Sequence, residues 1–239
     1  MTSVTALDVR RLFNVTQETR FRFNGWFRTR DEVVARVMEH VCRVVFALPA
    51  AEIEAAARSA PGPGPVPEVR EIAQWRPRFP FTVVAHHVVE ALGRLPDWPE
   101  FRAFCEADDV ARAMLWAPAL EVVNSAAADP RAARAALRAR VIADYLGFLR
   151  DLHVLAVLRG HGVEVLTHPL ADVVFQVDAW VERLVLNPRG GPQRSEALLV
   201  HAMPPYFFFD LAVGAPFDRV PLDRAARGLR EVLYPGAGS

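Results

Sequence analysis

Acidic side chains recur at alternate positions in HPLADVVFQVDAWVERLVLN, residues 168–187, and are the first candidates for chemistry. Asp172, Asp178 and Glu182 stand at even positions, whereas the odd positions from 173 to 181 are apolar. A period of two is typical of a β-strand, so these carboxylates are expected to share one face. Carboxylates gathered on a partly covered face bind cations or act as general acids and bases. The same alternation is also typical of an antiparallel strand with one solvated face, on which the acids have no chemical role.

Histidines supply a second set of candidate ligands. His161, His168 and Asp172 have side chains that zinc accepts, although their spacing matches no compact zinc pattern. His86 and His87 are adjacent in a predicted helix and therefore point to different faces. We do not expect these two to coordinate one ion, and we expect one of them to lie in the core.

An isolated aspartate and two cysteines are further candidates for chemical roles. Asp210 interrupts the apolar stretch YFFFDLAV, and burial of an unpaired carboxylate is costly, so it should lie at a strand end or meet an arginine. An enzyme of small molecules built around His201 and Asp210 is one alternative. Cys42 and Cys105 lie in helical apolar patterns, which predicts buried thiols in a reducing compartment.

A predicted β-hairpin near the N-terminus is the best candidate binding surface. It turns at Asn24-Gly25, and arginines alternate with aromatic residues on both sides of the turn. Its candidate contact residues are Arg20, Arg22, Trp26, Arg28 and Arg30. Arginines that meet phosphates and aromatics that stack on bases are typical of surfaces that bind single-stranded nucleic acid. Alternatively, the aromatics anchor the hairpin on the protein, or they contact a protein partner.

The composition excludes several classes of enzyme. The chain has 239 residues, is 52% hydrophobic and has zero formal net charge, so no global field attracts nucleic acid or an anionic membrane. All 28 basic residues are arginine. Without lysine there is no Schiff base, no P-loop lysine and no lysine base, which excludes pyridoxal enzymes, Walker-type NTPases and kinases.

The elements that must position these residues change in kind along the chain. Helical periodicity covers 33–48 and most of 68–128, and the clearest helix begins after Asp129 with Pro130 and ends at Gly160. Alternation then predicts a long strand from Asp172 to Trp180, with a hairpin partner at 184–187. We therefore expect an α+β fold with two parts. Residues 1–128 form a mainly helical region with an N-terminal β-hairpin, packed on residues 129–239, a mixed β-sheet flanked by helices.

The order of elements over residues 130–234 resembles the core of the restriction-endonuclease-like, PD-(D/E)xK, nucleases. The resemblance implies that Asp172 or Asp178 is the first metal-binding acid, with Mg²⁺ as the cofactor. It also implies an acid and a lysine on the next strand, where this chain has Val185 and Asn187. The catalytic signature is therefore incomplete.

Besides the small-molecule enzyme built around His201 and Asp210, two functions follow from these patterns, and they leave open whether the chain is an enzyme. The first is a non-catalytic binding or scaffolding protein with a degenerate nuclease-like core, whose partner is a protein, or nucleic acid through the hairpin. The alternative is a divergent metal-dependent phosphodiesterase that uses Asp172, Asp178 and Glu182. No signal peptide or membrane span is evident, so we expect a bacterial cytoplasmic protein without membrane contact.

Overall fold

A computed structural model describes residues 2–12, 32–62, 66–175, 177–181, 184–187, 207–210 and 215–234. The predicted hairpin that includes Arg20, Arg22, Trp26, Arg28 and Arg30 lies outside the described residues, as do Glu182 and His201.

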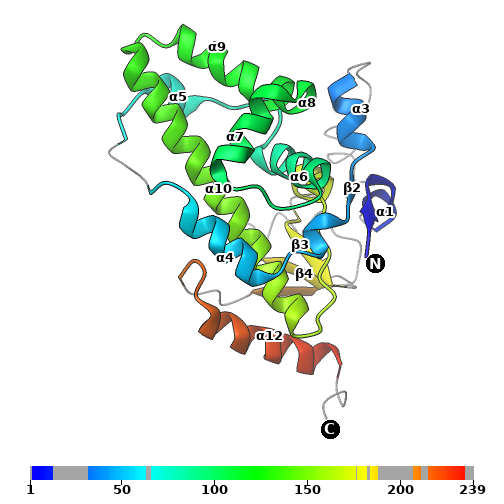
Figure 1. Ribbon diagram of the computed structural model, residues 1–239. Coiled ribbons are helices and arrows are strands. Elements are labelled where there is room, and N and C mark those ends of the chain that lie inside the picture. Colours follow the sequence, from blue (N-terminus) through cyan, green and yellow to red (C-terminus); the bar gives the residue numbers. More distant parts are fainter. Residues whose placement is uncertain are drawn as a thin grey trace.

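The longest helix, α10 (Pro130–Gly160), runs through the length of the molecule (Figure 1). It begins and ends at the residues that the sequence predicts. The Asp129 side chain accepts a hydrogen bond from the Ala132 N–H at 3.0 Å, and Pro130 occupies the first turn, where a missing N–H is tolerated. Beyond Gly160 the chain turns through Gly162, whose φ of +79° favours glycine.

Several helices pack on α10, whereas α1 and α3 lie farther away, beyond α6 (Figure 1). Helix α4 lies along α10, α5, α7 and α9 gather toward its N-terminal end, and α12 crosses its C-terminal end (Figure 1). Their bounds are α1 Ala6–Leu12, α3 Glu32–Met38, α4 Ala50–Ser59, α5 Arg70–Gln74, α6 Phe81–Leu92, α7 Trp98–Ala107, α8 Asp109–Ala111, α9 Ala117–Ser125 and α12 Arg219–Leu233. Shorter turns are the 3-10 helix η1 (Val44–Phe46) and the π-helices η2 (Arg112–Trp116) and η3 (Ala171–Phe175).

The larger of two hydrophobic clusters includes residues from Val4 to Leu229, and a smaller one joins α5 and α9 to the first turns of α10. Helix α10 buries Leu149 and Leu158 completely, and it also buries Tyr145, whose hydroxyl donates to the Pro96 carbonyl at 2.7 Å. Because a buried hydroxyl needs a partner, this bond fixes the loop before α7 on α10.

The predicted α+β fold class is wrong, because the described residues are predominantly helical and no sheet layer supports the helices. The strands are β1 Val4–Thr5, β2 Val41–Cys42, β3 Ala179–Val181, β4 Leu184–Asn187 and β5 Phe207–Asp210. Strands β1 and β2 pair antiparallel; β3 pairs antiparallel with β4, and β4 parallel with β5. Each has only two to four residues, so the core is formed between helices instead of on a sheet.

The predicted strand from Asp172 to Trp180 is wrong over its first half, which forms η3. Pro169 starts a helical turn, and the imidazole Nδ1 of His168 accepts the Leu170 N–H at 3.0 Å. Ala171, Val174 and Phe175 are buried and have the spacing of a helical face, whereas the apolar residues Ala171, Val173 and Phe175 also have the alternate spacing of a strand. Alternation was therefore not diagnostic here. The second half of the predicted strand contains the start of β3, which pairs with β4 in the antiparallel arrangement that the sequence predicted.

The predicted helix over 33–48 is also wrong beyond Met38, where α3 ends. The chain then becomes extended, and Cys42 pairs with Val4 in a two-stranded ribbon. The β-branched Val41 favours extended backbone and lies in β2, whereas Val44 and Val45 lie in the 3-10 helix η1 that follows. Both cysteines are buried and free, as predicted, but only Cys105 is helical.

None of the described helices combines the length and the apolar character needed to cross a membrane.

Candidate metal centre

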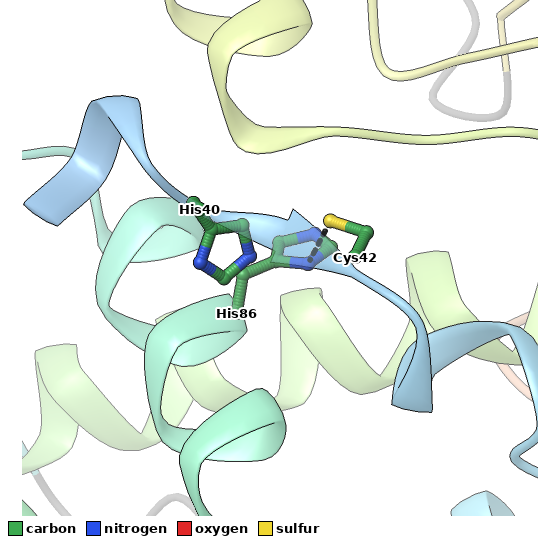
Figure 2. A group of neighbouring side chains, drawn as sticks. All are labelled: His40, Cys42 and His86. Atoms are coloured by element: carbon green, nitrogen blue, oxygen red, sulfur yellow. Dashed lines mark hydrogen bonds between the residues drawn. The ribbon is translucent and has the colours of Figure 1, made fainter. Parts of the chain in front are cut away.

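Three side chains with metal-binding atoms meet at the junction of β2 and α6. One ligand atom each from His40, Cys42 and His86 lies within 4.8 Å of the other two. Figure 2 shows the two imidazoles and the thiol facing one another, with His40 and Cys42 on the segment that enters β2 and His86 on α6. The Cys42 Sγ lies 3.5 Å from the His86 Nδ1.

The extended conformation around β2 places His40 and Cys42 on the same side. In an extended segment, residues two positions apart point to one face, whereas in a helix they point about 200° apart. Pairing of Cys42 with Val4 holds the strand in this register. A shift by one residue would present Val41 or Arg43 to α6 and would remove the thiol from the site.

Helix α6 carries a candidate ligand, His86, and also the carboxylate that anchors the segment after Cys42. His86 and Glu90 are four residues apart and thus lie on one face of the helix. The Glu90 carboxylate accepts hydrogen bonds from the backbone N–H groups of Arg43, Val44 and Val45 at 2.8, 3.0 and 3.2 Å. Charge-assisted bonds of this kind are stronger than neutral ones, so the loop that follows Cys42 is held on α6.

His168 supports the site from the other side. Its Nε2 donates to the His40 carbonyl at 3.2 Å while its Nδ1 accepts from the Leu170 N–H. Both ring nitrogens are therefore used, which makes His168 a support for the His40 backbone and not a ligand. Its ring packs edge-on against the His40 ring, with centroids 5.6 Å apart.

Burial sets the protonation states at the site. Desolvation, aided by His168 and His87, lowers the pKa of His40 to about 3, and desolvation with His40 lowers that of His86 well below its usual range. Desolvation and then Glu90 raise the pKa of the Cys42 thiol well above its ordinary value. At neutral pH the site therefore holds two neutral imidazoles and a protonated thiol, with the Cys42 Sγ within hydrogen-bonding distance of the His86 Nδ1.

The separation between Cys42 and His86 suits a tetrahedral transition-metal ion. Zinc binds sulfur at about 2.3 Å and imidazole nitrogen at about 2.0 Å, so tetrahedral angles place these donors about 3.6 Å apart. The Cys42–His86 pair already has a separation of 3.5 Å. The His40 Nε2 is buried and makes no hydrogen bond to a described residue, which is unusual for a polar atom and is explained by a role as a ligand.

The acids predicted from the sequence lie in a neighbouring cavity. Asp172, in η3, and Asp178, just before β3, line a space of about 20 Å³ together with Asp151 of α10. His86 lines the same space, so this cavity adjoins the metal centre. The structure thus brings Asp172 and Asp178 together, but neither belongs to the group of three ligands.

The other histidines that the sequence singled out are held elsewhere. His161 lies 2.9 Å from Asp223 of α12, whereas His168 faces His40, so the two do not share a site. His86 and His87 point to different faces of α6, as predicted, and the His87 Nε2 lies 3.0 Å from Asp108. His86 is the one that lies in the core.

His40 was not identified from the sequence, although a signal was present. The spacing His-x-Cys between 40 and 42 places two ligands on one face if the segment is extended. The sequence favoured a helix through 48, and in a helix His40 and Cys42 would point to different faces, so the spacing did not indicate a site. Recognition of the strand would have revealed the pair.

Comparisons of the chain with protein-family models, with curated proteins and with solved structures gave no match.

Proposed function

We propose that this chain is a metal-binding protein that holds a zinc-like divalent transition-metal ion through His40, Cys42 and His86. The observation that carries the proposal is the cluster of one thiol and two imidazoles within 4.8 Å, in which Cys42 and His86 are buried and His40 is partly exposed. Thiolate and imidazole ligands suit zinc, whereas magnesium prefers oxygen. The metal of this proposal therefore differs from the Mg²⁺ that the nuclease resemblance implies.

The role proposed for the ion is structural or regulatory, in keeping with a non-catalytic binding protein. Its ligands come from the segment before β2, from β2 and from α6, so a bound ion would join the N-terminal ribbon to the helical core. Metal binding adds to stability whenever the unfolded chain binds the ion more weakly. A reducing compartment such as the cytoplasm suits this role, because only a reduced thiol can serve as the ligand.

Titration of the metal-free protein with Co²⁺ tests the proposal, because cobalt reports its ligands by absorption. We expect one equivalent to bind, with a near-ultraviolet thiolate-to-cobalt band and visible bands of tetrahedral intensity, and Zn²⁺ to displace it. Cys42→Ser should remove the thiolate band and His86→Gln should weaken binding at least tenfold. Cys105→Ser is the matched control, since Cys105 is also a buried free thiol but lies in α7.

A thiolate band that persists in Cys42→Ser and disappears in Cys105→Ser would refute the assignment. Absence of any cobalt binding by the folded wild-type protein would refute the proposal itself.

The phosphodiesterase alternative keeps one supporting observation. Asp151, Asp172 and Asp178 line one cavity, whose volume of about 20 Å³ has room for one ion or water. The test is cleavage of DNA or RNA with Mg²⁺ or Mn²⁺, compared between wild type and Asp178→Asn. Metal-dependent cleavage that the substitution abolishes would favour this alternative, and absence of cleavage in the wild type would exclude it.

A further inference from the structure

A second cavity, remote from the metal ligands in sequence, lies between α7, η2, α9 and α10. Its volume is about 290 Å³, at the lower end of the range for small-molecule sites. The walls are apolar and include Phe101, Leu115, Trp116, Leu120 and Val141. Leu120 is 44% exposed, so the apolar surface continues from the cavity to solvent.

A local departure from α-helical geometry forms one wall. Residues Arg112–Trp116 form the π-helix η2 directly before α9. Pro118 has no N–H to donate to the Met114 carbonyl, which removes one α-helical hydrogen bond and favours the wider turn. This segment supplies Leu115 and Trp116 to the wall, and π-helical turns of this kind are frequent at functional sites.

All of the charged residues that line this cavity are arginines. Arg102 comes from α7, while Arg134 and Arg138 come from α10 and are four residues apart on one face. All three are exposed, and no hydrogen bond or ion pair joins them to a described residue. Other arginines nearby do have partners: Arg140 donates to the Ile72 carbonyl, and Arg112 donates to the Glu106 carbonyl.

An apolar cavity with a cationic rim is complementary to an anionic amphiphile. We propose that this site binds a medium-chain carboxylic acid, with its alkyl chain against Phe101 and Leu115 and its carboxylate at Arg134 and Arg138. Arginine suits this role, because its planar guanidinium pairs with both oxygens of a carboxylate. The proposal is independent of the metal site, since the cavity includes none of the three ligands.

Calorimetric titration with decanoate, decanol and decyltrimethylammonium tests the site, because the three probes share one chain and differ in charge. We expect saturable binding of one decanoate, at least tenfold weaker binding of decanol, and the weakest binding of the cation. The double variant Arg134→Glu and Arg138→Glu should reverse the order of the two charged probes. Both positions are exposed, so this variant should fold.

Two further variants separate the cavity from a general charge effect. Arg58→Glu with Arg224→Glu makes the same change in net charge outside the cavity lining and away from Arg134 and Arg138, and it should leave decanoate binding unchanged. Ala119→Trp fills the cavity and should abolish binding of both decanoate and decanol. Ala119 is only 4% exposed, so the fold of that variant must first be verified by circular dichroism.

Equal affinity for decanoate and decanol, or an unchanged order of probes in the Arg134→Glu and Arg138→Glu variant, would overturn the proposal. So would sedimentation of the wild type as a dimer that Leu120→Glu dissociates, because a second copy would then be the occupant of this surface.

Discussion

Acid should destabilise the metal-free protein at a pH where its carboxylates are still ionised. Three buried histidines cause this sensitivity. The pKa is about 3 for His40 and about 4 for His168, and it is well below the usual range for His86, in each case chiefly because of burial. In the unfolded chain a histidine titrates near pH 6.5. The folded protein therefore keeps these imidazoles neutral while the unfolded chain takes up protons.

The sign and the size of the effect follow from proton linkage. Between pH 6.5 and the folded pKa values the unfolded state binds more protons, so the free energy of unfolding falls as the pH falls. Each such histidine contributes about 1.4 kcal/mol per pH unit. At pH 5, His40 and His168 together lower the free energy of unfolding by about 4 kcal/mol relative to pH 7.5, and His86 adds to this loss. A domain has about 5–15 kcal/mol in total.

Urea unfolding with a chelator present, at about pH 7.5, 6 and 5, measures this effect. We expect the midpoint to change little between pH 7.5 and 6.5 and to fall steeply below. In His168→Gln one titrating group is absent, so the loss of stability between pH 7.5 and 5 should shrink by about 2 kcal/mol. The same free energy of unfolding at pH 5 and pH 7.5 in the wild type would refute this reasoning, as would an unchanged pH dependence in His168→Gln.

Three other predictions test the site and the core. Zinc binding near pH 7 should release one proton, from Cys42, because the two imidazoles are already neutral. Calorimetry in buffers of different ionisation enthalpy counts the released protons. Release of two or more would contradict these charge states. Glu90→Gln loosens the loop after Cys42 and should weaken Co²⁺ binding by about 10–100-fold with an unchanged spectrum, whereas an unchanged affinity would show that this anchor is not needed. Leu149→Ala should lower the free energy of unfolding by about 2–5 kcal/mol in urea denaturation, and a loss below 1 kcal/mol would show that α10 is not central to the core.

The long helix could be predicted from the sequence because its signals are local. Asp129, Pro130 and Gly160 mark its ends, and the apolar residues between them have only one suitable period. A local signal also marks the start of α12, where Asp218 is the N-cap.

Helices and strands whose type or ends depend on contacts with residues distant in sequence could not be predicted in this way. The end of α3 depends on Val4, which pairs with Cys42, and on Glu90, which holds the backbone that follows. Whether the segment around Asp172 forms a helical turn or a strand depends on His168, whose ring accepts the Leu170 N–H at the start of the turn. Because the apolar spacing over 171–175 suits both a strand and a helix, only these contacts decide between them.

The candidate site was missed for the same physical reason. His40, Cys42 and His86 come together only after the helix ends early and β1 pairs with β2. The acids at 172 and 178 were selected from a strand pattern that is wrong at Asp172, yet both line a cavity beside the candidate metal centre.

The enclosure of the ligands has a kinetic consequence. The His40 Nε2 is inaccessible to solvent and Cys42 is 0% exposed, so an ion in solution cannot reach the donors in the closed structure. Entry requires the short β1–β2 ribbon, which is closed by a two-residue pairing, to separate from α6. We therefore expect the rate of metal uptake to become independent of metal concentration at high concentration, where it equals the opening rate of the ribbon. Once trapped, the ion would dissociate no faster than the ribbon opens, so exchange would be slow even if the affinity were modest.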